Sequence, residues 1–137
     1  MERQGGVTYV ISEDGRPVTS FTTFSPTPCE IDGVGYRLSH EDKHRFWLEG
    51  PIGPAGIAYR VESGEVFVSS HSHELYLRRM GRFSPRWEVR HGGQVVGTCR
   101  MSAFSARADV PAHLPMPLRV LLFYVVIMTQ AGFILWF

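Results

Sequence analysis

The last 18 residues of the chain, Val120 to Phe137, carry no charged side chain. A largely apolar run of this length is unstable when it is exposed to water. It can cross a bilayer as a helix, or it can be a helix enclosed on all sides by the rest of the protein. A helix of this length is about 27 Å long, close to the hydrocarbon core of about 30 Å. The sequence therefore leaves two structures open: a membrane anchor and a caged helix.

The chain before this tail has the pattern of short β-strands. Alternation with a period near 2 occurs in the segments Val7–Ser12, Val18–Phe24, Gly33–Leu38, Ile57–Val61, Val66–Ser70 and Glu74–Arg79. The clearest hairpin is Ala58–Val68, with Ser63-Gly64 in its turn. Short strands at a spacing of 8–12 residues are typical of sandwiches and barrels. We expect a mainly β fold: a barrel-like antiparallel sheet of about ten short strands with one C-terminal hydrophobic α-helix.

The length of 137 residues fits one domain with a core of its own. We expect a β domain over residues 1–109 and a Pro-rich linker over residues 110–117. The hydrophobic helix then occupies residues 118–137, and it belongs to the same domain if the barrel encloses it.

The sequence also contains an internal repeat of a strand, a glycine turn and a second strand. Trp47–Arg60 and Trp87–Arg100 align at an offset of 40, where the two tryptophans coincide. A third copy of the core of this unit begins at Tyr9, six residues before Gly15. In each copy we expect the aromatic residue to anchor one arm in the core and glycine to close the hairpin.

The repeated unit and the terminal helix together resemble the tubby-like superfamily, which includes phospholipid scramblases and the LURP-one-related proteins. The residues that carry the resemblance are Trp87–Gly97, Ala108-Asp109 and Leu118–Phe137. The resemblance implies a closed twelve-stranded barrel around the C-terminal helix, and phosphoinositide binding, lipid scrambling or no known activity. The chain is short for twelve strands, and its helix lacks the late acidic residue often seen in scramblases. Lipid scrambling is therefore not implied, and no individual phosphoinositide ligand carries over.

Charge is distributed unevenly along the chain. Residues 1–74 hold 11 acidic residues against 6 basic ones, whereas residues 75–107 hold seven arginines and one acid, Glu88. Basic charge before a hydrophobic tail suits an anionic lipid surface on the cytoplasmic side of a membrane. The alternative is a solvated arginine face that balances the acidic first half. The candidate anion-binding and lipid-binding residues are Arg78, Arg79, Arg82, Arg86, Arg90 and Arg100.

Catalytic and metal chemistry has little support in the sequence. His71 and His73 would place two imidazoles on one face of a strand, but no third ligand has an obvious position. There is no Gly-x-Ser-x-Gly elbow and no phosphate loop, so we expect no catalytic residue and no cofactor. The net charge of +1 argues against a nucleic-acid partner.

These observations favour a non-enzymatic, membrane-associated or anionic-lipid-binding module of tubby-like or scramblase-like type. The first alternative is a tail-anchored accessory subunit of a membrane protein complex, and the second is a small metal-dependent enzyme. Two isolated cysteines and no secretory signal pattern fit a reducing compartment. We expect a location at the cytoplasmic face of a membrane, either peripheral or anchored by the C-terminal tail.

Overall fold

The computed structural model describes residues 8–23, 25–42, 44–81, 84–101 and 106–134, with the side chains of the C-terminal helix described as far as Thr129. These residues form eleven strands followed by one helix. The elements are β1 (Thr8–Glu13), β2 (Arg16–Thr22), β3 (Thr27–Ile31), β4 (Val34–Glu41), β5 (Arg45–Gly50), β6 (Gly53–Arg60), β7 (Val66–Ser70), β8 (His73–Arg79), β9 (Arg86–His91), β10 (Gln94–Met101), β11 (Ala106–Asp109) and α1 (Met116–Ile134).

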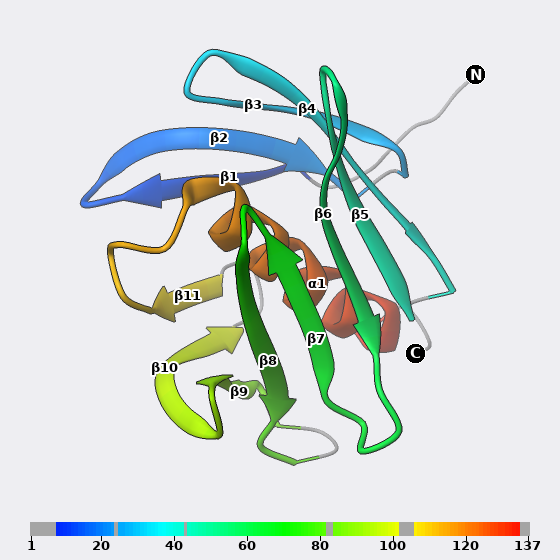
Figure 1. The fold of residues 1–137 in the computed structure, drawn as a ribbon, viewed down its shortest axis with the longest axis vertical. Helices are drawn as coiled ribbons and strands as arrows, with labels where there is room; N and C mark the ends of the chain where they lie inside the picture. The colour runs from blue at the N-terminus through cyan, green and yellow to red at the C-terminus, as the bar shows by residue number, and fades with distance from the viewer. Residues whose placement is uncertain (1–7, 24, 43, 82–83, 102–105, 135–137) are drawn as a thin grey trace.

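The strands form two antiparallel sheets that curl around α1 (Figure 1). One sheet contains β1 and β2, and the other contains nine strands, β3 to β11, paired in sequence order. The segment between β11 and α1 leads the chain from the edge of the large sheet into its hollow, and Leu114 in this segment is buried. The residues 110–117 that we expected to be a linker therefore include part of the core and the first two residues of the helix.

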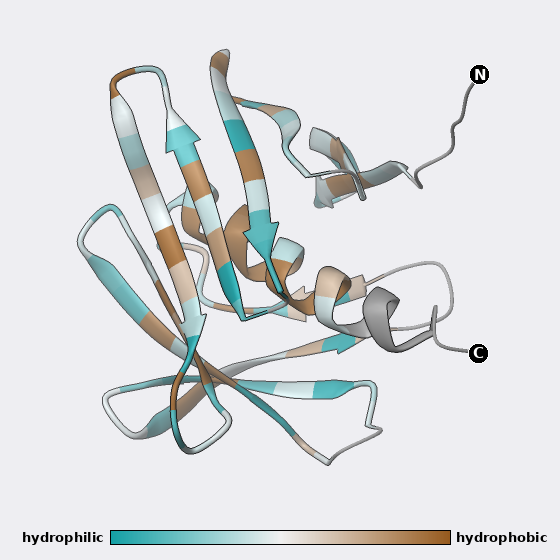
Figure 2. Cartoon of the chain, turned by 90° about the vertical axis from the view of Figure 1, so that its right-hand side faces the viewer, coloured by the Kyte–Doolittle hydropathy of each residue, from teal (hydrophilic) through white to brown (hydrophobic). Residues whose placement is uncertain are grey.

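The core lies between the concave face of the sheets and α1. Side chains on all sides of the helix are buried, among them the neighbours Val120, Leu121 and Leu122. The strands contribute every second side chain, as Leu75 and Leu77 do in β8. Figure 2 shows the same division, with a hydrophobic helix and strands on which hydrophobic and hydrophilic residues alternate.

The mainly β fold with a C-terminal helix is confirmed, but "barrel-like" overstates the closure of the sheet. Among the described residues neither sheet closes on itself, because the large sheet ends at β11 on one side and at β3 on the other. The part of the tail that is described takes the enclosed position. Within that same part of the chain, no helix is both long enough and apolar enough to cross a membrane.

The internal repeat exists in the structure, but its offset is 41 and not 40. Phe46 in β5 pairs with Ala58, and Trp87 in β9 pairs with Cys99, so Phe46 is the buried counterpart of Trp87. Trp47 points to the outer face of the sheet and is half-buried. The predicted match of the two tryptophans was wrong because a shift of one residue moves a side chain to the opposite face of a sheet.

Each of three hairpins, β1–β2, β5–β6 and β9–β10, carries a β-bulge in its second strand. In two of them a glycine follows the bulge. A Cβ atom at Gly56 would lie 3.0 Å from Cδ2 of Leu121, so this glycine allows α1 to approach the sheet closely. A Cβ atom at Gly97 would clash with the carbonyl oxygen of Asp109. Both glycines are therefore required by packing rather than by their backbone angles.

Replacement of Gly97 by alanine should destabilise the fold. We expect Gly97→Ala to lower the free energy of unfolding by about 1–3 kcal/mol, because the backbone of β11 must move to admit the methyl group. Urea denaturation measures the change. Gly35→Ala is the matched control, since a Cβ atom at Gly35 meets no atom within 4 Å. Equal stability of the two variants would contradict the packing role of Gly97.

The centre of the core contains a buried hydroxyl group on α1. Tyr124 is fully buried, and its Oη lies 2.9 Å from Nδ1 of His40. Ser25 Oγ accepts a hydrogen bond of 3.0 Å from the backbone N–H of His40. The rings of Phe21 and Phe46 pack edge-on against Tyr124, at centroid distances of 5.4 and 6.1 Å. Burial raises the pKa of Tyr124 to about 12, and a hydrogen bond with Ser25 acts in the opposite direction.

This pKa shift predicts a loss of stability in alkali. The unfolded chain releases the tyrosine proton near pH 10, whereas the folded protein holds the Tyr124 proton up to about pH 12. The unfolded state therefore binds fewer protons between these values, and stability falls as the pH rises through this window. We expect Tyr124 to account for about 3 kcal/mol of this loss when the pH has passed both pKa values. Urea denaturation at several pH values should show a shallower decline for Tyr124→Phe, and parallel curves for the two proteins would contradict the assignment.

Candidate anion-binding site

Three arginines form one lateral row across the outer face of β9, β10 and β11. Arg86 pairs directly with Arg100, and Arg100 pairs directly with Arg107. The row follows from strand alternation, because Trp87 and Cys99 point into the core and their neighbours must point outward. All three arginines are exposed.

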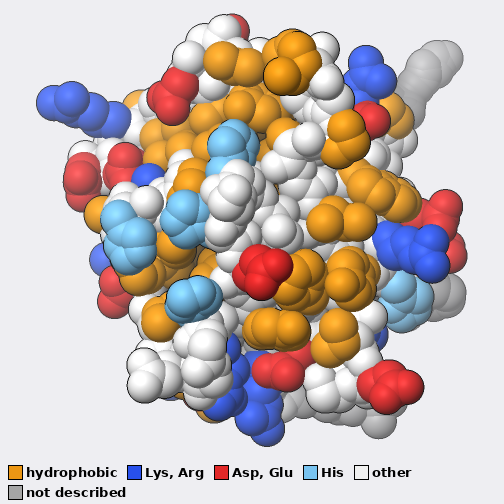
Figure 3. All heavy atoms as spheres, viewed as in Figure 1, with side chains coloured by type: hydrophobic (Ala, Val, Ile, Leu, Met, Phe, Trp, Pro, Cys, Tyr) orange, Lys and Arg blue, Asp and Glu red, His pale blue; other side chains and the backbone are white. Residues whose placement is uncertain are grey.

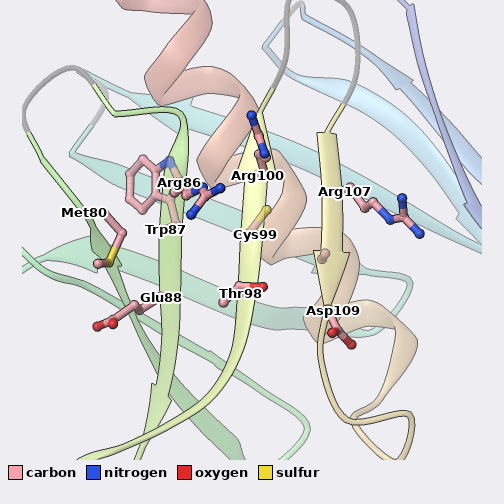
Figure 4. Close-up of a pocket in the computed structure, with 10 residues that line it drawn as sticks. Met80, Arg86, Trp87, Glu88, Thr98, Cys99, Arg100, Arg107 and Asp109 are labelled. Carbon is pink, nitrogen blue, oxygen red and sulfur yellow. The ribbon is translucent and has the colours of Figure 1, made fainter.

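The row borders a shallow hollow of about 620 Å³. Figure 4 shows Arg86 and Arg100 on neighbouring strands, while the guanidinium group of Arg107 extends away from β10. The next row of outward side chains contains Glu88, Thr98 and Asp109, and the three of them also line the hollow. The hollow therefore has a basic end and an end that is acidic or neutral.

The arginine row has no carboxylate partners within the described chain. The salt bridges described there join Arg90 to Glu88 at 3.4 Å and Arg119 to Glu13 at 2.6 Å. Directly opposed like charges on neighbouring strands destabilise a sheet. A phosphate or another multivalent anion between the guanidinium groups would relieve this repulsion, and the planar guanidinium group matches its oxygen atoms.

The six arginines predicted from the sequence do not form one patch. Arg86 and Arg100 lie in the row, whereas Arg78 is the direct cross-strand partner of Glu88. Arg90 donates hydrogen bonds to Glu88 and to the carbonyl oxygen of Gly93. Arg82 lies outside the described residues.

Arg79 packs against the core residue Trp87. Its guanidinium carbon lies 5.8 Å from the ring centroid of Trp87, and its Nε donates a 2.8 Å hydrogen bond to the carbonyl oxygen of Ser84. Burial lowers the pKa of Arg79, and the nearby Arg60 lowers it further. These contacts assign Arg79 to the packing of Trp87.

Arg107 was missed because no strand was predicted over residues 106–109. The only signal is the alternation of small and charged residues in Ala106-Arg-Ala-Asp109, which is too short to identify a strand by itself. Its pairing with β10 is what brings Arg107 beside Arg100.

The two histidines of the metal hypothesis do not share a strand face. His71 and Ser72 form the tight turn between β7 and β8, with φ angles of +52° and +65°. Nδ1 of His71 lies 2.8 Å from Ser70 Oγ, and Nδ1 of His73 donates to the carbonyl oxygen of His71 at 2.9 Å. The described residues contain no group of three His, Cys, Asp or Glu side chains that could hold a metal ion. The placement of both imidazoles on one strand was therefore wrong.

The cysteine thiols are packing groups of the core. Cys29 and Cys99 are both buried, and burial raises the pKa of Cys99 to about 12. Burial also raises the pKa of Cys29, against the effect of a hydrogen bond with Thr19. Neither thiol forms an appreciable amount of the nucleophilic thiolate near neutral pH.

No protein-family model, no curated protein and no solved structure matches this chain.

Replacement of Arg79 should affect stability and not anion binding. We expect Arg79→Met to lower the free energy of unfolding by about 1–2 kcal/mol, because it removes the cation–π contact and the bond to Ser84. Thermal unfolding measures the loss, and stabilisation by added inorganic phosphate should be as large as in the wild type. Loss of the phosphate effect in this variant would place Arg79 in the anion site.

Proposed function

We propose that the protein is a non-enzymatic module that binds an anionic lipid surface through the row Arg86–Arg100–Arg107. The observation that carries the proposal is the direct alignment of three exposed arginines without carboxylate partners in the described chain. Phosphate groups of membrane phospholipids supply the anion. The protein would then be peripheral, at the cytoplasmic face of a membrane.

The expected strength of binding follows from the number of arginines. Each basic side chain near an anionic leaflet contributes about 1 kcal/mol, so three contribute about 3 kcal/mol. This suffices for reversible recruitment and not for permanent anchoring. Because the row is exposed, the attraction should weaken as the ionic strength rises.

The two alternatives from the sequence have less support. A tail anchor would require α1 to leave the core, which would expose the side chains of Leu118, Leu121 and Val125 together with the concave face of the sheet. A metal-dependent enzyme would require more ligands than His71 and His73 offer in their observed positions. The lipid-binding proposal needs no rearrangement of the fold.

The central arginine of the row gives the sharpest test. We expect Arg100→Gln to weaken sedimentation with phosphatidylserine-containing vesicles by about 5-fold, and the triple variant with Arg86→Gln and Arg107→Gln to weaken it by about 100-fold. Arg100→Gln should also raise the melting temperature slightly at low salt, because it removes repulsion within the row.

Arg16→Gln, at an exposed arginine on the small sheet, is the matched control and should bind vesicles as the wild type does. Circular dichroism establishes that each variant is folded. The proposal fails if the folded triple variant sediments with anionic vesicles like the wild type.

A further inference from the structure

A second surface feature lies on the outer face of β5 to β8. Five large apolar side chains gather there, and we call them the aromatic patch: Trp47, Ile57, Tyr59, Phe67 and Tyr76. Trp47 pairs with Ile57, while Tyr59, Phe67 and Tyr76 form one row across three strands. The ring centroids in this row are 5.2 and 5.3 Å apart, so the rings form a continuous strip.

The aromatic patch is additional to the core. The residues between its members, such as Ala58, Val68 and Leu75, point inward and pack toward α1. On the outside, Ile57 and Tyr59 are each 40% exposed and Tyr76 is 38% exposed. In Figure 1 no described element covers this face. Figure 3, in the same view, shows hydrophobic side chains gathered to the right of the centre of the picture. A contiguous apolar patch of this kind marks an interaction site.

Basic side chains flank the row of rings. Arg45 pairs with Tyr59 at one end, and Arg90 pairs with Tyr76 at the other end. Arg78 follows Tyr76 on the outer face of β8. Acidic side chains also border the patch: Glu74 is the partner of Ser69, and Glu65 lines a hollow together with Tyr76, Arg78 and Arg90. The patch thus combines an apolar centre with arginines whose stems can lie along it.

We infer that the aromatic patch is the surface that enters the interface of a lipid bilayer. This inference rests on the proposed function. Tyrosine and tryptophan have an apolar ring and a polar group, and they are enriched where hydrocarbon meets the headgroups. Arginines at the margin of such a patch meet the phosphates of the same leaflet.

The aromatic patch and the arginine row lie on one continuous surface. The outward residues of β8 are Glu74, Tyr76 and Arg78, and the next outward position is Met80. The backbone N–H of Met80 donates a 2.9 Å hydrogen bond to the carbonyl oxygen of Arg86, the first residue of the arginine row. A single lipid surface can therefore meet the ring of Tyr76 at the middle of β8 and the guanidinium group of Arg86 beyond its C-terminal end.

The test measures the contribution of the tyrosine rings to vesicle binding separately from that of the arginines. We expect Tyr59→Ser with Tyr76→Ser to weaken sedimentation with phosphatidylserine-containing vesicles by about 10-fold, because two half-exposed rings no longer enter the interface. Tyr59→Phe with Tyr76→Phe should retain binding. Val10→Ser is the control for loss of an exposed apolar side chain elsewhere, since Val10 is 60% exposed on the small sheet.

Tryptophan fluorescence locates the patch in the bilayer. The chain has a third tryptophan, Trp136, outside the described residues, so the measurement is made in a Trp136→Phe background. Vesicles with brominated acyl chains should quench the emission of this protein, and the quenching should fall by half or more when Trp47→Phe is added. Trp87 is only 2% exposed and should contribute little to the quenching. Equal quenching in the two proteins would overturn the inference.

Vesicle binding by the variants distinguishes failure of the aromatic-patch inference from failure of the arginine-row proposal. Wild-type vesicle binding by the Tyr→Ser double variant overturns the role of the patch and leaves the arginine row in place. Conversely, if the arginine triple variant binds normally while the double variant loses binding even to neutral vesicles, the proposed function fails and the patch is retained. If light scattering shows a dimer that the double variant converts to monomer with unchanged vesicle binding, the occupant is a second copy and the inference is wrong.

Discussion

The burial of α1 is the constraint on which the rest of the structure depends. An amphipathic helix can rest on a flat sheet, but this helix buries neighbouring residues such as Leu121 and Leu122, which point in different directions. A single flat sheet covers only one side of a helix. The strands must therefore curl around the helix, and eleven short strands in two sheets accomplish this in the described chain.

The curvature in turn depends on local irregularities of the strands. A β-bulge bends its strand and increases the twist, and the bulges of the β5–β6 and β9–β10 hairpins occupy equivalent positions in the repeat. Gly56 follows one bulge, where the side chain of Leu121 comes closest to the sheet, and Gly97 follows the other, where the carbonyl oxygen of Asp109 at the end of β11 comes closest. A side chain at Gly56 would push α1 away from the sheet, and a side chain at Gly97 would push the end of β11 away from β10.

The sequence was sufficient where local pattern decides the structure. Strict alternation predicted Val66–Ser70 with the bounds of β7, and the uncharged run predicted the helix. The sequence-based prediction failed where strand pairing determines the face on which a side chain lies. Register depends on turns and bulges, and the pattern of one strand does not reveal them. Trp47 was placed in the core for this reason, and the alignment of Arg100 with Arg107 could not be foreseen without β11.

The outer face of the sheet shows which charges serve the fold and which do not. On β8 and β9 the pairing of Arg78 with Glu88 sets opposite charges side by side, which stabilises a sheet. Two positions along β9, the same sheet sets Arg86 against Arg100, which costs stability. Since the concave face is filled by α1, neither row can serve the core. An anion bound between the arginines of the second row would offset their repulsion, so its binding to the outer face of β9 to β11 would stabilise the fold.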